Sequence, residues 1–368
     1  MLSVAVVKKL GSEQWGDIVL LQLAYYLITT ITAWGNKDYL LVQYNASPNK
    51  ISSLWQKSFI TRGLFLLVPA VVFCLLFMPS STSMHLVIWV ISRFVAQSFE
   101  SLVVYYKRYF WPVVAEFMPL IITVVFWLDS STEVYLDTIL WLLTISHVIR
   151  AVIVVLFYAK LLPGIFNQKV QLRQLSSSFY FALLAFAVFL QVKSDLYCMG
   201  YFGNPSQVGT YQIWVSYLTL FAAVPTFLLM PFMANIYQMN KPDITSLNRK
   251  IVLLGLLLAP FCTLFLVPVF SSFYQLTFTT VDYILAALYL LIPYFYALKV
   301  YMLYKQSKSK TVLIFSLLAV LVNVIVCAVL IPVLGITGAM VANVSAQVFI
   351  YLLYQFKSKR ILEGVTHV

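Results

Sequence analysis

The chain has 368 residues, of which 62% are hydrophobic and only 10% are charged, against about 25% charged residues in ordinary soluble domains. Too few ionisable side chains are present to cover a water-facing surface, so the composition excludes a soluble enzyme and indicates a membrane-integral protein. The net charge of +12 does not indicate nucleic-acid binding, because the basic residues lie between the apolar segments.

Eleven apolar segments are long enough to cross a membrane, since a spanning helix needs about 20 mostly apolar residues. In chain order we expect spans at 17–41, 58–79, 84–106, 109–128, 136–159, 175–200, 208–236, 251–270, 280–304, 311–333 and 337–356. Repeated prolines inside spans predict kinked helices that neighbouring helices accommodate: Pro69, Pro225, Pro260 and Pro293. The predicted fold class is all-α and polytopic.

Between the predicted spans, gaps that contain Lys or Arg alternate with gaps that contain neither. The gaps at 80–83, 129–135, 201–207, 271–279 and 334–336 carry none, and every other gap carries at least two. Because basic residues are retained on the cytoplasmic side, the tail with Lys357 and Arg360 places the C-terminus inside. Eleven spans then put the N-terminus outside, where Lys8 and Lys9 violate the rule. We therefore expect residues 1–10 to be the stub of a first helix in a twelve-helix architecture.

A long predicted loop, 160–174, divides the chain into an N-terminal lobe at 1–165, whose first helix is the stub, and a C-terminal lobe at 166–368. A weak internal similarity supports two lobes, because the glycine-flanked segments Gly11–Gly16 and Gly203–Gly209 each lead into a span. Parallel repeats of this kind build transporters with a substrate site between the lobes. This similarity has an equally good steric explanation, since short turns favour glycine.

Ionisable residues inside spans cost several kcal/mol on insertion scales and are functional candidates. Arg93, Gln97 and Glu100 follow a spacing of i, i+4 and i+7, which places them on one helical face. Glu116 lies between two prolines and is a plausible partner for an arginine on a neighbouring helix. Arg150 lies well inside the fifth span.

Lys193 and Asp195, in the outer half of the sixth span, complete the candidate set. We expect a polar cavity lined by Arg93, Gln97, Glu100, Glu116, Arg150, Lys193 and Asp195. The carboxylates have an alternative role as interhelical ion pairs that fix packing. For the two arginines we favour cavity lining, because two cations in one lobe exceed the needs of local pairing.

The sequence carries no motif for catalysis or metal binding. Four cysteines lie in or beside apolar runs without CxxC spacing, which indicates neither a disulfide framework nor a zinc site. There are only three histidines, and DxD, GxSxG, HExxH and P-loop motifs are absent. We therefore expect no cofactor. A membrane-embedded glycan polymerase or acyl/glycosyltransferase, and a structural scaffold, are the weaker alternatives.

Three sequence blocks carry a family resemblance. Gly11-Ser-Glu-Gln-Trp-Gly16 followed by Trp34-Gly-Asn-Lys-Asp-Tyr-Leu-Leu41 resembles the first block of Wzx-type O-antigen flippases, which belong to the multidrug/oligosaccharidyl-lipid/polysaccharide exporter superfamily. Lys193-Ser-Asp-Leu-Tyr-Cys-Met-Gly200 with Val208-Gly-Thr-Tyr211 is similar to the block that opens the second lobe. Leu330-Ile-Pro-Val-Leu-Gly-Ile-Thr-Gly-Ala339 is similar to the block before the last span. The first helix of the family is largely absent here.

The resemblance implies a multi-pass transporter of the bacterial inner membrane, and not an enzyme. Its substrate would be an oligosaccharide linked to undecaprenyl diphosphate, an O-antigen or capsular repeat unit, moved by alternating access between two lobes. The implied partners are this lipid-linked substrate, membrane lipids, a coupling ion (H⁺ or Na⁺) and a glycan polymerase, without nucleic acid. Arginine suits such a substrate because its planar fork binds phosphate through two hydrogen bonds. A drug or metabolite exporter of the same superfamily is an alternative with the same topology.

Overall fold

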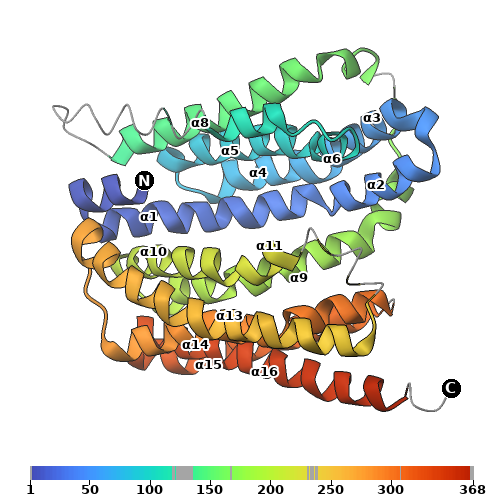
Figure 1. The fold of residues 1–368 in the computed structure, drawn as a ribbon. Coiled ribbons are helices and arrows are strands. Elements are labelled where there is room, and N and C mark those ends of the chain that lie inside the picture. The colour runs from blue at the N-terminus through green and yellow to red at the C-terminus, as the bar shows by residue number, and fades with distance from the viewer. Residues whose placement is uncertain are drawn as a thin grey trace. The chain divides into compact units, whose positions relative to one another are not determined.

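The computed structural model describes residues 2–117, 121, 136–165, 168–229, 232, 236, 239–306 and 308–364. Within these ranges every regular element is a helix (Figure 1), which confirms the predicted all-α class. The predicted fourth span at 109–128 falls in part, and the gap at 129–135 entirely, outside the described residues.

Ten helical stretches in the described ranges are long and apolar enough to cross a membrane: Val6–Ala46, Pro48–Phe77, Thr82–Tyr105, Leu136–Phe157, Leu172–Phe202, Pro205–Leu229, Pro242–Tyr274, Thr280–Leu303, Lys310–Leu334 and Ile336–Lys357. Large apolar side chains on them face outward, and Leu76, Leu257 and Val333 are each more than two-thirds exposed. In water such a surface would be unstable, whereas lipid solvates it. The chain is therefore a multi-pass membrane protein.

The first helix differs from its prediction at both ends. α1 (Leu2–Ala33) begins well before residue 17, with a non-helical residue at Gly11 (φ 90°), and α2 (Asn36–Ala46) continues past residue 41. The helix is interrupted at Trp34 and Gly35, which both have positive φ. A Cβ atom on Gly35 would lie 2.3 Å from the carbonyl carbon of Phe181. Only glycine therefore permits this turn with another helix so close.

The second predicted span also begins earlier than expected. A short 3₁₀ turn, η1 (Pro48–Lys50), leads into α3 (Ile51–Arg62), a π-helical turn η2 (Gly63–Leu67) and α4 (Val68–Phe77). The prediction began at residue 58 because 48–57 is rich in polar residues, which hydropathy does not count toward a span. The remaining helices before residue 203 are α5 (Ser80–Ser98), α6 (Glu100–Tyr105), α8 (Leu136–Phe157), the 3₁₀ turn η3 (Ala159–Leu161) and α9 (Leu172–Phe202).

The later helices cover the predicted apolar spans, and some extend beyond them. They are α10 (Pro205–Ala222), α11 (Val224–Leu229), α13 (Lys241–Pro268), the π-helical turn η6 (Val269–Tyr274), α14 (Thr280–Lys305), α15 (Ser309–Leu334) and α16 (Ile336–Gly364). α14 and α15 agree with the predicted 280–304 and 311–333 within two residues at each end. α13 begins ten residues before the predicted span 251–270, and α16 ends eight residues after the predicted span 337–356. These helix ends are polar, and hydropathy does not count polar residues toward a span.

The four prolines behave in two ways. The π-helical turn η2 directly precedes the start of α4 at Val68 and Pro69, and the helix is interrupted at Ala223 before Pro225. α13 and α14 continue as helices through Pro260 and Pro293. The interruptions fit the missing amide donor of proline, which local π or turn geometry accommodates.

The chain divides into two compact units, Met1–Phe189 and Leu190–Val368, here called unit 1 and unit 2. Figure 1 shows helices α1 to α8 of unit 1 in blue to green and helices α10 to α16 of unit 2 in yellow-green to red. The lobe boundary at 165 that the long loop suggested stays a prediction.

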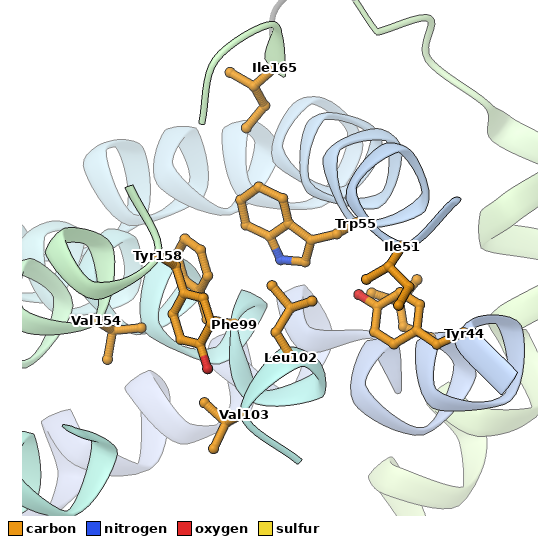
Figure 2. Packing of buried hydrophobic residues seen from close by; sticks show 10 residues of the cluster. Tyr44, Ile51, Trp55, Phe99, Leu102, Val103, Val154, Tyr158 and Ile165 are labelled. Atoms are coloured by element: carbon orange, nitrogen blue, oxygen red, sulfur yellow. The ribbon is translucent and has the colours of Figure 1, made fainter. Parts of the chain in front are cut away.

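A buried cluster with an aromatic centre packs several helices of unit 1 against one another (Figure 2). Trp55 lies at its centre, with its ring 4.7 Å from that of Phe99, and Phe99 stacks on Tyr158 at 5.3 Å. The indole N–H of Trp55 donates to the carbonyl oxygen of Ser98, 2.7 Å away, where α5 ends. This contact holds the junction between α5 and α6, and so positions the first residue of α6, Glu100.

Candidate ligand cavity

Unit 1 contains a cavity of about 180 Å³ between the ends of several helices. Part of its lining is charged and comprises Lys37, Arg93, Glu100, Glu116 and Arg150. The rest is apolar and comprises Ala96, Val103, Val104, Pro112, Ala115 and Val154. Val103 and Val154 also belong to the aromatic cluster. The cavity therefore has a rigid, well-packed wall.

Arg93 and Glu100 form one ion pair of the cavity. Arg93 Nη2 donates to Glu100 Oε1 over 3.2 Å, across the junction between α5 and α6 at Phe99. The Arg93 and Glu100 side chains are 27% and 41% exposed. The predicted stripe on one helical face thus brings these two residues together, although a helix break separates them.

Arg150 and Glu116 form the second ion pair. Arg150 Nη2 on α8 donates to Glu116 Oε2 over 2.5 Å, and the side chains are 20% and 58% exposed. Glu116 lies in the helical residues 110–117, so the sequence correctly indicated a pairing with an arginine on a neighbouring helix. The Nε atom of Arg150 is buried and has no hydrogen-bond partner among the described residues. Glu116 therefore does not satisfy the Nε–H donor of Arg150.

The charges of the cavity favour an anion. Three cations and two carboxylates line it, which leaves a formal surplus of one positive charge (3 − 2). Guanidinium groups beside apolar side chains suit a ligand that carries both an anionic group and an apolar or flat surface. Among the described residues no group of three or more His, Cys, Asp or Glu side chains is arranged to hold a metal ion.

Gln97 shares its helix face with Arg93 but does not line the cavity. Its Oε1 atom is buried without a hydrogen-bond partner in the part of the chain that the structure describes. His147, three residues before Arg150, has Nδ1 3.4 Å from the hydroxyl of Tyr25, and its ring packs 5.6 Å from that of Trp89. His147 therefore lies in an aromatic environment that suits a neutral imidazole.

Asp195 lies in unit 2, within a hydrogen-bond network of its own, and is 3% exposed. Its Oδ2 accepts from the hydroxyl of Tyr211 at 2.5 Å and from Nδ2 of Asn343 at 2.9 Å, and its Oδ1 accepts from the backbone N–H of Leu196. Asn323 extends the network by donating to Asn343 Oδ1 at 2.8 Å. Donors from three helices satisfy this carboxylate, as buried polar groups require.

Lys193 is two residues from Asp195 on α9 and partly buried. The roles of these two residues in binding a substrate stay predictions.

Arg62 is a buried arginine that the sequence analysis did not single out. It is 2% exposed, and its Nη1 donates to the carbonyl oxygens of Thr32 and Ala33 at 3.1 and 3.4 Å. Its Nη2 donates to Ser98 Oγ at 2.9 Å, and its guanidinium lies 5.1 Å from the centre of the Phe94 ring. These are the carbonyls at the C-terminal end of α1, where a cation is favourable.

The signal that could have identified Arg62 is its position four residues inside the predicted span 58–79, directly before Gly63. Lys37 was missed because it follows the apolar part of its span and reads as a membrane-edge lysine. Asn323 and Asn343 were missed because a single amide within an apolar run looks unremarkable in isolation, although each must find a partner in a membrane.

No protein-family model and no curated protein sequence matches this chain. Several solved structures match it. An inward-facing multidrug resistance MATE family transporter of the MOP superfamily matches with a TM-score of 0.69 and 11% identity, over 98% of this chain and 94% of that one.

Two further structures match over nearly the whole chain. The lipid II flippase MurJ in an inward closed conformation gives a TM-score of 0.62 and 16% identity, over 97% of this chain and 84% of that one. A MOP superfamily transporter from Pyrococcus furiosus gives a TM-score of 0.52 and 11% identity, over 100% of this chain and 97% of that one. The chain therefore has the fold of MOP superfamily transporters, the superfamily whose polysaccharide flippases the sequence blocks resemble.

Proposed function

We propose that the chain is a flippase of the bacterial inner membrane that moves an undecaprenyl-diphosphate-linked oligosaccharide, an O-antigen or capsular repeat unit, by alternating access between two lobes. The observation that carries the proposal is the cavity of unit 1, where Arg93 and Arg150 lie together inside apolar helices. Arginines inside apolar helices are costly unless they are paired or lie in a polar cavity, and here each is paired with a carboxylate that lines the same cavity.

The chemistry of the cavity fits a diphosphate. Each guanidinium offers five N–H donors in a planar fork, and each uses only one nitrogen on its carboxylate partner in the described part of the chain. Lys37 adds a third cation, and the apolar wall suits a prenyl chain or the flat face of a sugar. One of the matching structures is named as a lipid II flippase, which supports a lipid-linked cargo.

A drug or metabolite exporter is the second candidate. The multidrug resistance transporter matches with a higher TM-score than the lipid II flippase. The carboxylates Glu100 and Glu116 also give the cavity two groups that attract cations. We favour the anionic cargo because the cations of the cavity outnumber its carboxylates.

For coupling, the candidates for binding H⁺ or Na⁺ are the carboxylates Glu100, Glu116 and Asp195. A C-terminus in the cytoplasm and a glycan polymerase as a functional partner complete the proposal.

The orientation is testable with single cysteines. Tyr201→Cys, in an exposed position, should react with a membrane-impermeant thiol reagent in intact cells, and Lys305→Cys should react only after the membrane is opened. The reverse result would invert the orientation.

The test of function is surface glycan formation in a host that makes a lipid-linked glycan but lacks its own flippase. The wild-type chain should restore the glycan, and the double variant Arg93→Ala with Arg150→Ala should abolish it at unchanged membrane abundance. The double Lys variant should retain part of the function, because it keeps the charges but loses the forks.

Arg173→Ala is the matched control, since Arg173 is exposed and lies outside the cavity. It should export glycan like the wild type. If the double Ala variant restores full glycan formation, the cavity does not bind the cargo. If the wild-type chain restores no glycan but exports cationic dyes, the exporter is the correct function.

A further inference from the structure

His85 is a buried histidine of unit 1 that neither the cavity nor the proposed function uses. It lies in the second turn of α5, and its side chain is 5% exposed. Its Nδ1 lies 2.9 Å from Thr144 Oγ1, and its Nε2 lies 3.7 Å from Asp137 Oδ1. Thr144 and Asp137 both belong to α8. The imidazole therefore connects α5 to α8 through both of its nitrogen atoms.

The other partners of Thr144 determine which nitrogen of His85 carries a hydrogen. The indole N–H of Trp89 donates to Thr144 Oγ1 over 2.7 Å, and the Thr144 hydroxyl donates to the carbonyl oxygen of Leu140 over 2.7 Å. A hydroxyl has one hydrogen to donate and accepts through its lone pairs. Because that hydrogen is used on Leu140, Thr144 accepts from His85. Nδ1 of His85 is therefore the donor and carries a hydrogen.

The hydrogen on Nδ1 leaves Nε2 facing a carboxylate. A neutral imidazole carries a hydrogen on one nitrogen only, so neutral His85 directs the Nε2 lone pair at Asp137 Oδ1, 3.7 Å away. Two acceptors at this distance repel each other. A proton on Nε2 turns the same contact into an ion pair, in which each charge favours the other. Imidazole is the side chain that takes up such a proton between about pH 5 and 8.

Asp137 is the charged partner that the neighbouring helices offer to His85. The other titratable groups nearest to this part of α5 are Asp17 and Tyr25 on α1, Cys74 on α4 and His147 on α8. In the described part of the chain, none of them forms a hydrogen bond or an ion pair with His85. Farther along α5 lies Arg93, about 12 Å from His85 along the helix, and Lys37 of α2 and Glu100 of α6 lie beside Arg93 in the cavity lining.

His85 and Asp137 lie at the edge of their membrane spans. His85 is the fourth residue of the span Thr82–Tyr105, and Asp137 is the second residue of the span Leu136–Phe157. At 1.5 Å per residue, each lies within about 5 Å of the start of its span, within reach of interfacial water. Residues 80–83 carry no Lys or Arg, so in the proposed orientation this edge faces away from the cytoplasm.

We infer that His85 takes up a proton from water on Nε2 and then forms an ion pair with Asp137 that joins the ends of α5 and α8. No covalent bond of the protein breaks, and the neutral form keeps the Thr144 contact alone. The same two helices carry Arg93 and Arg150 of the cavity. The proton concentration at this edge therefore sets how firmly the two helices are held together. The inference goes beyond the proposed function and does not depend on the cargo.

Solid-state NMR of the full chain in lipid bilayers, with isotopically labelled histidine nitrogens, tests the inference between about pH 5 and 8. The chain has three histidines, so His147→Gln and His367→Gln assign two signals and leave the signal of His85. At the upper end of the range His85 should be neutral with its hydrogen on Nδ1. At the lower end both nitrogens should carry a hydrogen.

Asp137→Asn tests the partner. The pH at which half of His85 is protonated should fall by about half a unit, because the Asp137 side chain is 73% exposed and such ion pairs are weak. Asp38→Asn is the matched control, since Asp38 is an exposed aspartate in the first turn of another helix of unit 1. It should titrate like the wild type.

Three results would overturn the inference. A neutral His85 with its hydrogen on Nε2 would contradict the hydrogen-bond pattern of Thr144, and a His85 that stays neutral down to about pH 5 would show that no proton is bound. If Asp137→Asn titrates like the wild type, with an unchanged His147 signal as a sign of intact packing, the ion pair is wrong. Asp137→Ser repeats this comparison if the His147 signal shifts. None of these results bears on the cargo of the cavity.

Discussion

Unit 1 uses buried arginine in two contrasting ways. Arg62 is 2% exposed and holds the end of α1 through carbonyl and hydroxyl oxygens, none of which is able to leave. Arg150 is partly exposed and holds Glu116, a carboxylate that is 58% exposed and lines the cavity. The same residue type thus closes a helix junction in one region and faces an open cavity in the other.

The difference teaches that the partner, not the arginine, separates a structural cation from a binding one. Carbonyl oxygens at a helix end are part of the fold, so breaking their contact leaves buried acceptors unsatisfied. A carboxylate on a mobile side chain is replaceable by a ligand, so losing that contact costs little stability. Substitutions at the two places should therefore separate stability from function.

The largest effect on stability is expected at Arg62. Arg62→Met fills a similar space but leaves the carbonyls of Thr32 and Ala33 without donors, which should lower the free energy of unfolding by about 3 kcal/mol. Arg150→Met should change it by less than about 1 kcal/mol, because the released Glu116 is exposed. Unfolding in a titration from mild detergent to dodecyl sulfate measures both. Equal losses at the two positions would remove the distinction between them.

Gly35→Ala tests whether the Arg62 region is as rigid as its contacts indicate. The added Cβ would lie 2.3 Å from backbone of Phe181 on α9, at a positive φ that alanine rarely adopts. A loss of about 2 kcal/mol is expected from strain and overpacking together. Gly63→Ala is the control, because its nearest neighbour would lie at an ordinary 3.8 Å. A melting temperature unchanged in Gly35→Ala would mean that α9 yields easily.

Trp55→Phe links the two regions and is expected to have a smaller effect than Arg62→Met and Gly35→Ala. It removes the N–H that donates to the Ser98 carbonyl, and Ser98 is also bound by Arg62 through its hydroxyl. The loss should be about 1 kcal/mol. Because the same contact holds the junction before Glu100, the affinity of the cavity for geranyl diphosphate, measured by isothermal titration calorimetry in detergent, should change as well. A change in stability with wild-type affinity would show that the junction does not position the Arg93 and Glu100 pair.

Individual residues show how much of the site could be predicted from the sequence. Arg93, Glu100, Glu116 and Arg150 were predicted together and line one cavity, because an ionisable residue in an apolar run is visible from sequence alone. The network around Asp195 was not predicted, since Asn343 is 148 residues away. Only packing of separate helices brings such side chains together, and no local pattern encodes that contact.

The sequence by itself determined the class of the protein and most of its helices, because the length of an apolar run and its polar breaks are local properties that the membrane enforces. It also determined which side chains are costly in lipid. The tertiary structure alone decided what those side chains do. In the sequence, Arg62 and Arg150 are both single arginines in apolar segments. In the structure, Arg62 donates to backbone carbonyls at the C-terminal end of α1, whereas Arg150 pairs with the partly exposed carboxylate of Glu116. Partner identity and solvent access arise between helices, where sequence spacing carries no information.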